Sequence, residues 1–151
     1  MFPIESFKNA LLKFVEILNR QEIPFHLTGG ITGVAYGEPR LTQDIDIVIQ
    51  NATSVAKLDV YPREMIEGEL SRSQELEIFE SVRLPIASRL DAAVSKLIWS
   101  SKGSHKSRRD FRQIFIRSSE AENERVREMA NKLGLENLLD EVIAESDEIT
   151  G

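Results

Sequence analysis

The chain has 151 residues, with 29% charged and 41% apolar side chains and a net charge of −6, a balance typical of a globular domain. It contains no cysteine, which excludes disulfides, thiolate metal sites and cysteine nucleophiles. No apolar run is long enough to span a bilayer, and Glu5 and Glu16 interrupt the N-terminal apolar stretch, unlike a signal peptide. We therefore expect one cytoplasmic domain over residues 1–151 that does not contact a membrane.

The first part of the chain alternates between helix and strand patterns. Apolar side chains recur at helical spacing up to residue 20, and Pro24 disfavours continuation of that helix. In DIDIVIQ, acids alternate with isoleucine, which predicts a strand with carboxylates on one face. The expected segments are a helix (5–20), a strand (25–28), a short helix (31–36) and two strands (44–50 and 57–61).

The later part of the chain is mostly helical in pattern. Residues 63–83 are polar and are expected to form a loop with a helical turn. Ser88 and Asp91 resemble a capping box that starts a helix, and Gly134 suits a helix C-cap. The expected segments are a strand (84–87) and four helices (88–99, 107–116, 120–132 and 135–145). The chain is thus expected to have an α+β fold, with a small mixed β-sheet core over 1–90 and a helical half over 91–151.

Charge is unevenly distributed along the helical half. Residues 96–117 contain seven lysines and arginines and only Asp110 as an acid, whereas residues 118–151 contain ten acids and three bases. The acidic total argues against wholesale coating of nucleic acid, while the basic segment permits local phosphate contacts. A solvated helix face is the alternative interpretation of this segment.

Residues 27–49 carry the strongest functional pattern. Gly29 and Gly30 follow a strand and precede a helix, which allows backbone N–H groups to approach a phosphate. Asp44 and Asp46 have the spacing that projects two carboxylates from one face of a strand. Mg²⁺ relieves the repulsion between such carboxylates and binds substrate phosphates as well. Asp59, in KLDVY, is the candidate third acid of a metal site.

Two other groups of residues are interpreted as structural. Trp99, Phe111 and Phe115 have spacings typical of helix packing, which we favour over base-stacking platforms. His26 lies within a predicted strand and is interpreted as a structural histidine.

The order of these motifs resembles that of the nucleotidyltransferase (DNA polymerase β-like) superfamily. The finer resemblance is to small bacterial nucleotidyltransferases such as the toxins of abortive-infection type IV systems, and it extends over residues 23–143. The segments that carry it are GEPRLTQDIDIVI, KLDVYP, SRSQ, IASRLDAAVSKLIW and SRRDFRQIF. The resemblance implies Mg²⁺-dependent transfer of a nucleoside monophosphate from an NTP to a hydroxyl. The implied acceptor is RNA, a protein or a small molecule, and a cognate partner protein is implied by the toxin–antitoxin context.

The resemblance also implies roles for the glycines and acids. Gly29 and Gly30 would hold the triphosphate. Asp44 and Asp46 would bind the metal ions, and Asp59 would complete the acidic set and activate the acceptor hydroxyl.

Further roles are implied for basic and polar residues. Lys96 matches a lysine that neutralises phosphate charge, with a lysine lying along the helix surface as the alternative. Arg109 and Asp110 match a charged helix motif that supports the nucleotide site. Arg40 and Thr42 precede the acidic strand, where Arg40 would contact a phosphate or brace the loop.

The chain departs from the resembled pattern at two places. Only residues 50–57 separate the two acidic strands, where relatives insert a helix and another strand, so this is a shortened form or a sequence that lacks a segment. Gln113 occupies a position where close relatives have an acid. A non-catalytic nucleotide- or partner-binding module and a purely structural adaptor therefore remain as alternatives to the enzyme.

Overall fold

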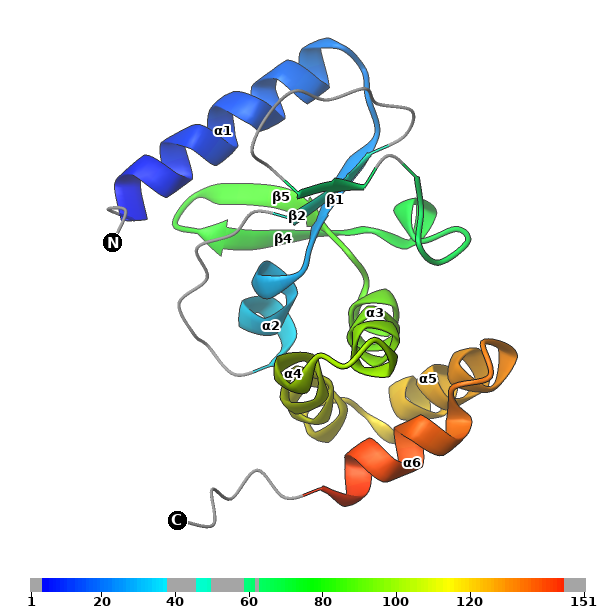
Figure 1. Cartoon of the computed structure of the whole chain (residues 1–151). Coiled ribbons are helices and arrows are strands. Elements are labelled where there is room, and N and C mark those ends of the chain that lie inside the picture. Colours follow the sequence, from blue (N-terminus) through cyan, green and yellow to red (C-terminus); the bar gives the residue numbers. More distant parts are fainter. Residues whose placement is uncertain (1–3, 38–45, 50–58, 62, 146–151) are drawn as a thin grey trace.

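A five-stranded mixed sheet organises the molecule, in the order β3–β2–β1–β5–β4 (Figure 1). The computed structural model describes residues 4–37, 46–49, 59–61 and 63–145. The strands are β1 (Phe25–Thr28), β2 (Asp46–Ile49), β3 (Asp59–Tyr61), β4 (Gln74–Phe79) and β5 (Val82–Ile86). The central strand β1 pairs antiparallel with β2 and parallel with β5. β3 runs parallel to β2, and β4 runs antiparallel to β5.

Helices cover both faces of this sheet. Figure 1 shows α1 (Ile4–Arg20) on one side and α2 (Gly30–Tyr36), α3 (Arg89–Ser101) and α4 (His105–Ile116) on the other. α5 (Glu120–Lys132) and α6 (Glu136–Ala144) form an outer layer beyond α3 and α4. In the described part of the chain, the strands all precede residue 87 and the later elements are helices, which confirms the α+β class and its helical second half.

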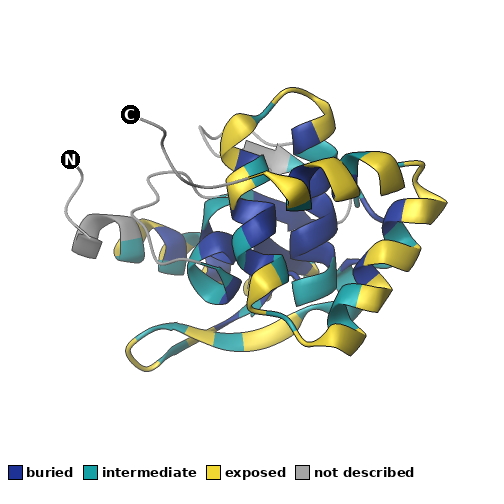
Figure 2. Ribbon diagram, turned by 90° about the horizontal axis from the view of Figure 1, so that it is seen from below, coloured by how far each residue is buried: buried dark blue, intermediate teal, exposed yellow. Residues whose placement is uncertain are grey.

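The core lies where the sheet meets these helices. Leu27, Ile47 and Ile86 come from three neighbouring strands and are fully buried, as are Leu11 of α1 and Leu97 of α3. Because β1 is central and covered on both sides, all four of its residues are buried. Figure 2 shows the buried residues in the middle of the molecule and exposed ones on the outer helices. None of the helices in the described ranges is both long and apolar enough to cross a membrane.

Most of the predicted elements are present with small shifts in their ends. The predicted strand 44–50 appears as β2 over residues 46–49, and residues 44, 45 and 50 lie outside the described part of the chain. The predicted helix over 107–116 begins two residues earlier, because Ser104 caps it by accepting a hydrogen bond from the backbone N–H of Ser107. Gly134 follows α5 with φ of 70°, as expected for a residue that ends a helix.

The prediction of a loop with a helical turn over residues 63–83 is correct for the turn but wrong from residue 74 onward, where two strands form. A short 3₁₀ helix (Leu70–Arg72) leads into β4, which forms a hairpin with β5. The alternation of Glu75, Leu76 and Glu77 is a strand signal, but glutamate is uncommon in strands and the turn lacks Gly or Asn. Ser81 instead supplies the left-handed turn conformation, with φ of 62°.

The start of α3 is capped, but only half of the predicted capping box forms. Ser88 Oγ accepts a hydrogen bond from the backbone N–H of Asp91 at 3.1 Å, and the same hydroxyl donates to the Asp91 carboxylate. That buried carboxylate accepts from Arg72 Nη2 at 2.6 Å and from Arg72 Nε at 3.0 Å. A two-point ion pair therefore joins the 3₁₀ helix to α3.

Candidate functional site

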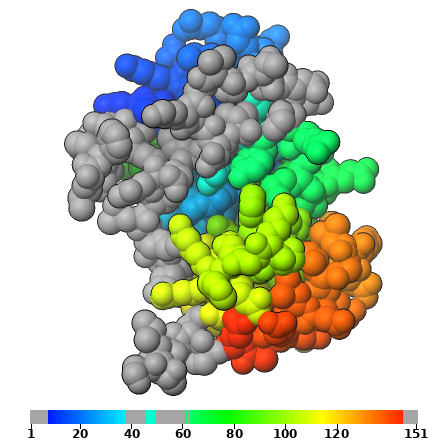
Figure 3. All heavy atoms as spheres, in the orientation of Figure 1, coloured from blue at the N-terminus to red at the C-terminus, as the bar shows by residue number. Residues whose placement is uncertain are grey.

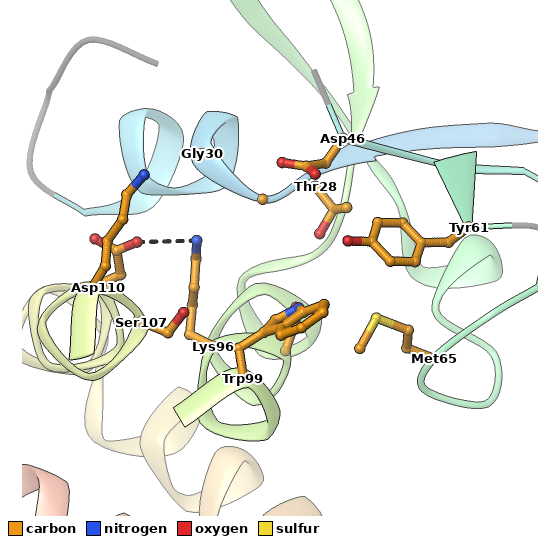
Figure 4. A pocket seen from close by; sticks show the side chains of 12 residues that line it. Thr28, Gly30, Asp46, Tyr61, Met65, Lys96, Trp99, Ser107 and Asp110 are labelled. Carbon is orange, nitrogen blue, oxygen red and sulfur yellow. Dashed lines mark ion pairs between the residues drawn. The ribbon is translucent and has the colours of Figure 1, made fainter. Parts of the chain in front are cut away.

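A pocket opens between the end of β1, the ends of β2 and β3, and the facing surfaces of α3 and α4 (Figure 4). Its volume is about 160 Å³. The pocket takes residues from distant parts of the sequence, because the sheet and the helical half each supply one wall. Among the residues that the structure describes, the lining is formed by Thr28, Gly29, Gly30, Asp46, Tyr61, Met65, Ser95, Lys96, Trp99, Lys106, Ser107 and Asp110.

The backbone at Gly29 leaves room for the Asp46 carboxylate. Gly29 has φ of 66° and ψ of −131°, a conformation open mainly to glycine. A β-carbon at this position would lie 1.8 Å from Asp46 Oδ2, far inside van der Waals contact. Glycine is thus required here both by its backbone conformation and by the close approach of an acid.

Strand pairing places two of the three predicted acids next to each other. Asp46 is the register partner of Thr28 on β1 and of Asp59 on β3. The third predicted acid, Asp44, lies outside the described residues. Within the described ranges, no group of three histidine, aspartate or glutamate side chains is arranged to hold a metal.

The residues present fit a magnesium ion in their donor chemistry. Mg²⁺ binds through one or two carboxylates together with substrate phosphates and water. Asp46 supplies a carboxylate oxygen in the space that a side chain at residue 29 would fill, at the wall of a pocket that also contains lysines. Asp59 is the register partner of Asp46 on β3.

A buried polar cluster supports β1 just before the glycines. His26 is fully buried, and its Nδ1 donates to Ser73 Oγ at 2.8 Å, because the Ser73 hydroxyl proton goes to the Leu70 carbonyl. His26 Nε2 lies 3.3 Å from Glu69 Oε2, without good hydrogen-bond alignment, so the two groups form an ion pair when the imidazole is protonated. Burial raises the pKa of Glu69, but contacts with His26 and the backbone N–H groups of Met65 and Ile66 outweigh it and hold the pKa below its ordinary value. The structural interpretation of His26 is thus confirmed.

One end of the pocket is cationic. Lys96 Nζ lies 3.1 Å from Asp110 Oδ2, and both side chains are only 8% exposed (Figure 4). Ser107 of α4 lies beside Lys96 in Figure 4, and Lys106 of the same helix also lines the pocket. A buried lysine held by a carboxylate at the wall of a pocket presents a positioned charge to an anionic ligand.

The other end of the pocket is aromatic. Tyr61 and Trp99 meet edge to face, with ring centroids 6.5 Å apart and planes inclined by 62°, and Met65 lies beside them (Figure 4). Lys102 Nζ sits over the indole ring, 4.7 Å from its centroid. Phe111 and Phe115 pack against each other between helices as expected, but Trp99 lines the pocket.

The basic segment is divided between the pocket and the outer helices. Lys96 and Lys106 line the pocket, whereas Arg108 and Arg112 pair with Glu145 next to α6. The Arg112 Nη1 to Glu145 Oε2 distance is 2.5 Å. Figure 3 shows the yellow α4 against the orange and red α5 and α6. Part of the positive charge in the sequence is therefore used for helix packing.

The predicted site residues are not all in the pocket. Gly29, Gly30, Asp46 and Lys96 line it. Arg109 is exposed on α4 and is not among the lining residues. Arg40 and Thr42 lie outside the described residues.

The sequence patterns singled out Lys96 and Asp110 but not six other described residues of the lining: Thr28, Tyr61, Met65, Ser95, Lys106 and Ser107. For those on the two helices, a signal was present in the spacing. α3 contributes Ser95, Lys96 and Trp99, which lie at positions i, i+1 and i+4. α4 contributes Lys106, Ser107 and Asp110 at the same spacing. This spacing places three residues on one side of a helix. Both helices carry polar residues on the side that faces the other elements. Because buried polar groups need partners, this pattern indicates a shared pocket.

The chain matches no model of a known protein family, and no curated protein matches it significantly.

Proposed function

We propose that this chain is a Mg²⁺-dependent nucleotidyltransferase that moves a nucleoside monophosphate from an NTP to a hydroxyl acceptor. One observation carries the proposal: a single pocket gathers Gly29–Gly30, Asp46 and Lys96, which come from separate parts of the sequence. These are the residues to which the motif pattern assigns phosphate and metal binding. Core packing alone does not explain why these residues lie together, because charged groups are costly to bury. Two lysines and two acids are among the described residues that line this pocket.

The cationic end suits the triphosphate. Lys96 is held by Asp110 at 3.1 Å, and Lys106 lies on the next helix, so the pocket wall carries two ammonium groups that can contact phosphate oxygens. The glycine at position 29 removes the side chain that would separate a phosphate from Asp46. A Mg²⁺ ion held by Asp46, with Asp44 and Asp59, would neutralise phosphate charge and align the α-phosphate.

In the proposed reaction, the acceptor hydroxyl attacks the α-phosphorus and pyrophosphate leaves. Asp59 takes or orients the proton of that hydroxyl. The proposed acceptors are hydroxyls of RNA, of a protein or of a small molecule. The proposal includes action beside a cognate partner protein, as in the toxin–antitoxin systems that the motif order resembles.

The test is transfer of label from each α-labelled NTP, with Mg²⁺ and with total RNA and total protein as acceptors. Wild-type chain should label one acceptor class, and Asp46→Asn should label none while keeping its fold by circular dichroism. Asp140→Asn is the matched control, because Asp140 is exposed on α6 and pairs with Arg127 away from the pocket. Equal labelling by wild type and Asp46→Asn would overturn the proposal.

A second candidate, a nucleotide-binding module without turnover, is favoured by one observation. β2 ends at residue 49 and parallel β3 begins at residue 59, so nine residues connect them. Parallel crossovers usually need a dozen or more residues, and the resembled enzymes have additional structure here. Mg²⁺-dependent NTP binding with no labelled product from any acceptor fraction would select this candidate.

A further inference from the structure

We propose that Trp99 is the platform for the nucleobase of the bound nucleotide, and that the pocket therefore binds purine nucleotides more tightly than pyrimidine nucleotides. This inference rests on the proposed function, because it assumes that the ligand of the pocket is a nucleotide. It assigns a specificity role to a residue whose helical spacing suggests only packing.

The first observation is the division of the pocket into two chemically different ends. The cationic end contains Lys96 with its partner Asp110, on helices α3 and α4, and Lys106 of α4 also lines the pocket. The aromatic end contains Tyr61, Met65 and Trp99. Figure 4 shows Asp46 and Gly30 above the space between the two ends. A ligand that fills this pocket needs an anionic part and a flat apolar part, and a nucleotide has both.

The second observation is the exposure of the aromatic end. Tyr61, Met65 and Trp99 are each only partly buried, although Leu97 on the same helix as Trp99 is completely buried. An indole that served only to pack α3 would gain most by being covered entirely. Trp99 instead keeps part of its surface open at the wall of the pocket.

The third observation concerns the neighbours that hold the indole in place. Lys102 covers one face of the ring, and the ring of Tyr61 meets it at 62°. These contacts restrict the orientation of the indole before any ligand binds, which lowers the entropic cost of stacking a base on the remaining surface.

Base size gives the expected specificity. Every base has a π-face, so an aromatic platform accepts all four, and preferences arise from stacking strength rather than from hydrogen bonds. A purine overlaps an indole over a larger area than a pyrimidine does. ATP and GTP should therefore bind more tightly than CTP and UTP.

The decisive measurement uses wild-type protein, because Trp99 is the only tryptophan in the chain. Its fluorescence is followed during titration with each Mg-NTP and with Mg-tripolyphosphate, which has the phosphates but no base. All four NTPs should quench the indole, and tripolyphosphate should bind by calorimetry with little quenching. Quenching by tripolyphosphate equal to that by ATP would overturn the proposal.

Variants test the same contact without the fluorescence signal. Trp99→Leu should raise the Kd for Mg-ATP about ten-fold, the range of base–aromatic stacking, and leave the Kd for Mg-tripolyphosphate unchanged. Trp99→Phe keeps a ring and should recover most of the affinity, which a loss of folding would not allow. Phe115→Leu is the control, because Phe115 is a partly buried aromatic residue on α4 outside the pocket lining.

The outcomes separate this proposal from the proposed function. If Trp99→Leu binds Mg-ATP as tightly as wild type while Asp46-dependent transfer of label continues, Trp99 is not the platform and the enzyme assignment stands. If ATP binds more weakly than CTP, the purine preference is wrong. If neither tripolyphosphate nor any NTP binds, the nucleotide function and the platform both fail.

Discussion

The Asp46 carboxylate occupies the space that a side chain on Gly29 would need, since Oδ2 lies 1.8 Å from the position of a β-carbon there. Gly29 ends the turn after β1, and Asp46 begins the neighbouring strand β2. This contact joins the glycine turn and the acidic strand into one local structure. The turn is therefore part of the acidic site and does not merely connect β1 to α2.

Replacement of Gly29 should damage both stability and the site. In Gly29→Ala, the strained backbone alone costs about 1–3 kcal/mol, and displacement of the Asp46 carboxylate adds to this loss. Gly134→Ala is a matched control, because Gly134 has a similar φ of 70° and no atom within 4 Å of its added β-carbon. Urea unfolding should show a larger loss for Gly29→Ala, and only this variant should lose Mg-NTP binding. Equal losses in both variants would contradict the role given to the Asp46 contact.

Removal of the Lys96 ammonium should destabilise the chain because it leaves a buried charge. Both side chains of the Lys96–Asp110 pair are 8% exposed, so Lys96→Met should lower the free energy of unfolding by about 3–5 kcal/mol. Lys96→Met with Asp110→Leu should recover much of that stability but should still not bind tripolyphosphate. Lys132→Met, at an exposed position on α5, is the control. Recovery of binding together with stability in the double variant would show that Lys96 only supports the fold.

The pKa of Glu69 predicts a specific acid sensitivity. This pKa is lowered in the folded state by contacts with His26 and backbone N–H groups that outweigh the opposing effect of burial. A lowered pKa means that the stabilisation is present above the unfolded value, about 4.3, and is lost as the pH falls through the folded value. Between about pH 7 and about pH 3, wild type should therefore lose more stability than Glu69→Gln.

The Glu69→Gln variant also has an expected effect at neutral pH and a matched control. At neutral pH, Glu69→Gln should itself be less stable than wild type by about 1–3 kcal/mol, the cost of weakening a buried hydrogen-bonded group. Glu80→Gln, at the exposed turn between β4 and β5, should follow wild type at every pH. Parallel stability–pH curves for wild type and Glu69→Gln would contradict the prediction.

Nucleotide binding should require both the divalent ion and Asp46. At a nucleotide concentration of about one hundred times Kd, Mg-ATP should stabilise the wild type by about 2.7 kcal/mol, or roughly 5–10 °C in Tm for a domain of this size. Chelation of Mg²⁺ with EDTA should abolish this shift, as should Asp46→Asn. Asp140→Asn should retain it. A shift that persists with EDTA would mean that the pocket binds nucleotide without a metal.

Local sequence patterns determined most of the secondary structure. Apolar spacing, Pro24 and the serine before α3 were enough to predict the main helices, because these features act within a few residues of one another. Local sequence was also enough to place the glycines and acids relative to the strands, since Gly29–Gly30 follows a strand and Asp46 begins one. The hairpin of β4 and β5 was missed because the glutamates of β4 are poor strand formers, and pairing with β5 decides their conformation.

Only the tertiary structure decided which of the residues in these patterns lie close together. The sequence marked Gly29 and Asp46 separately, but only the β1–β2 register brings a carboxylate into the space beside the glycine. Helical spacing placed Trp99 on a face of α3, but only its contact with Tyr61 of β3 and the approach of α4 decided that it lines a pocket. The physical reason is that periodicity specifies which side of an element is buried, whereas the partner that buries it depends on contacts between residues distant in the chain.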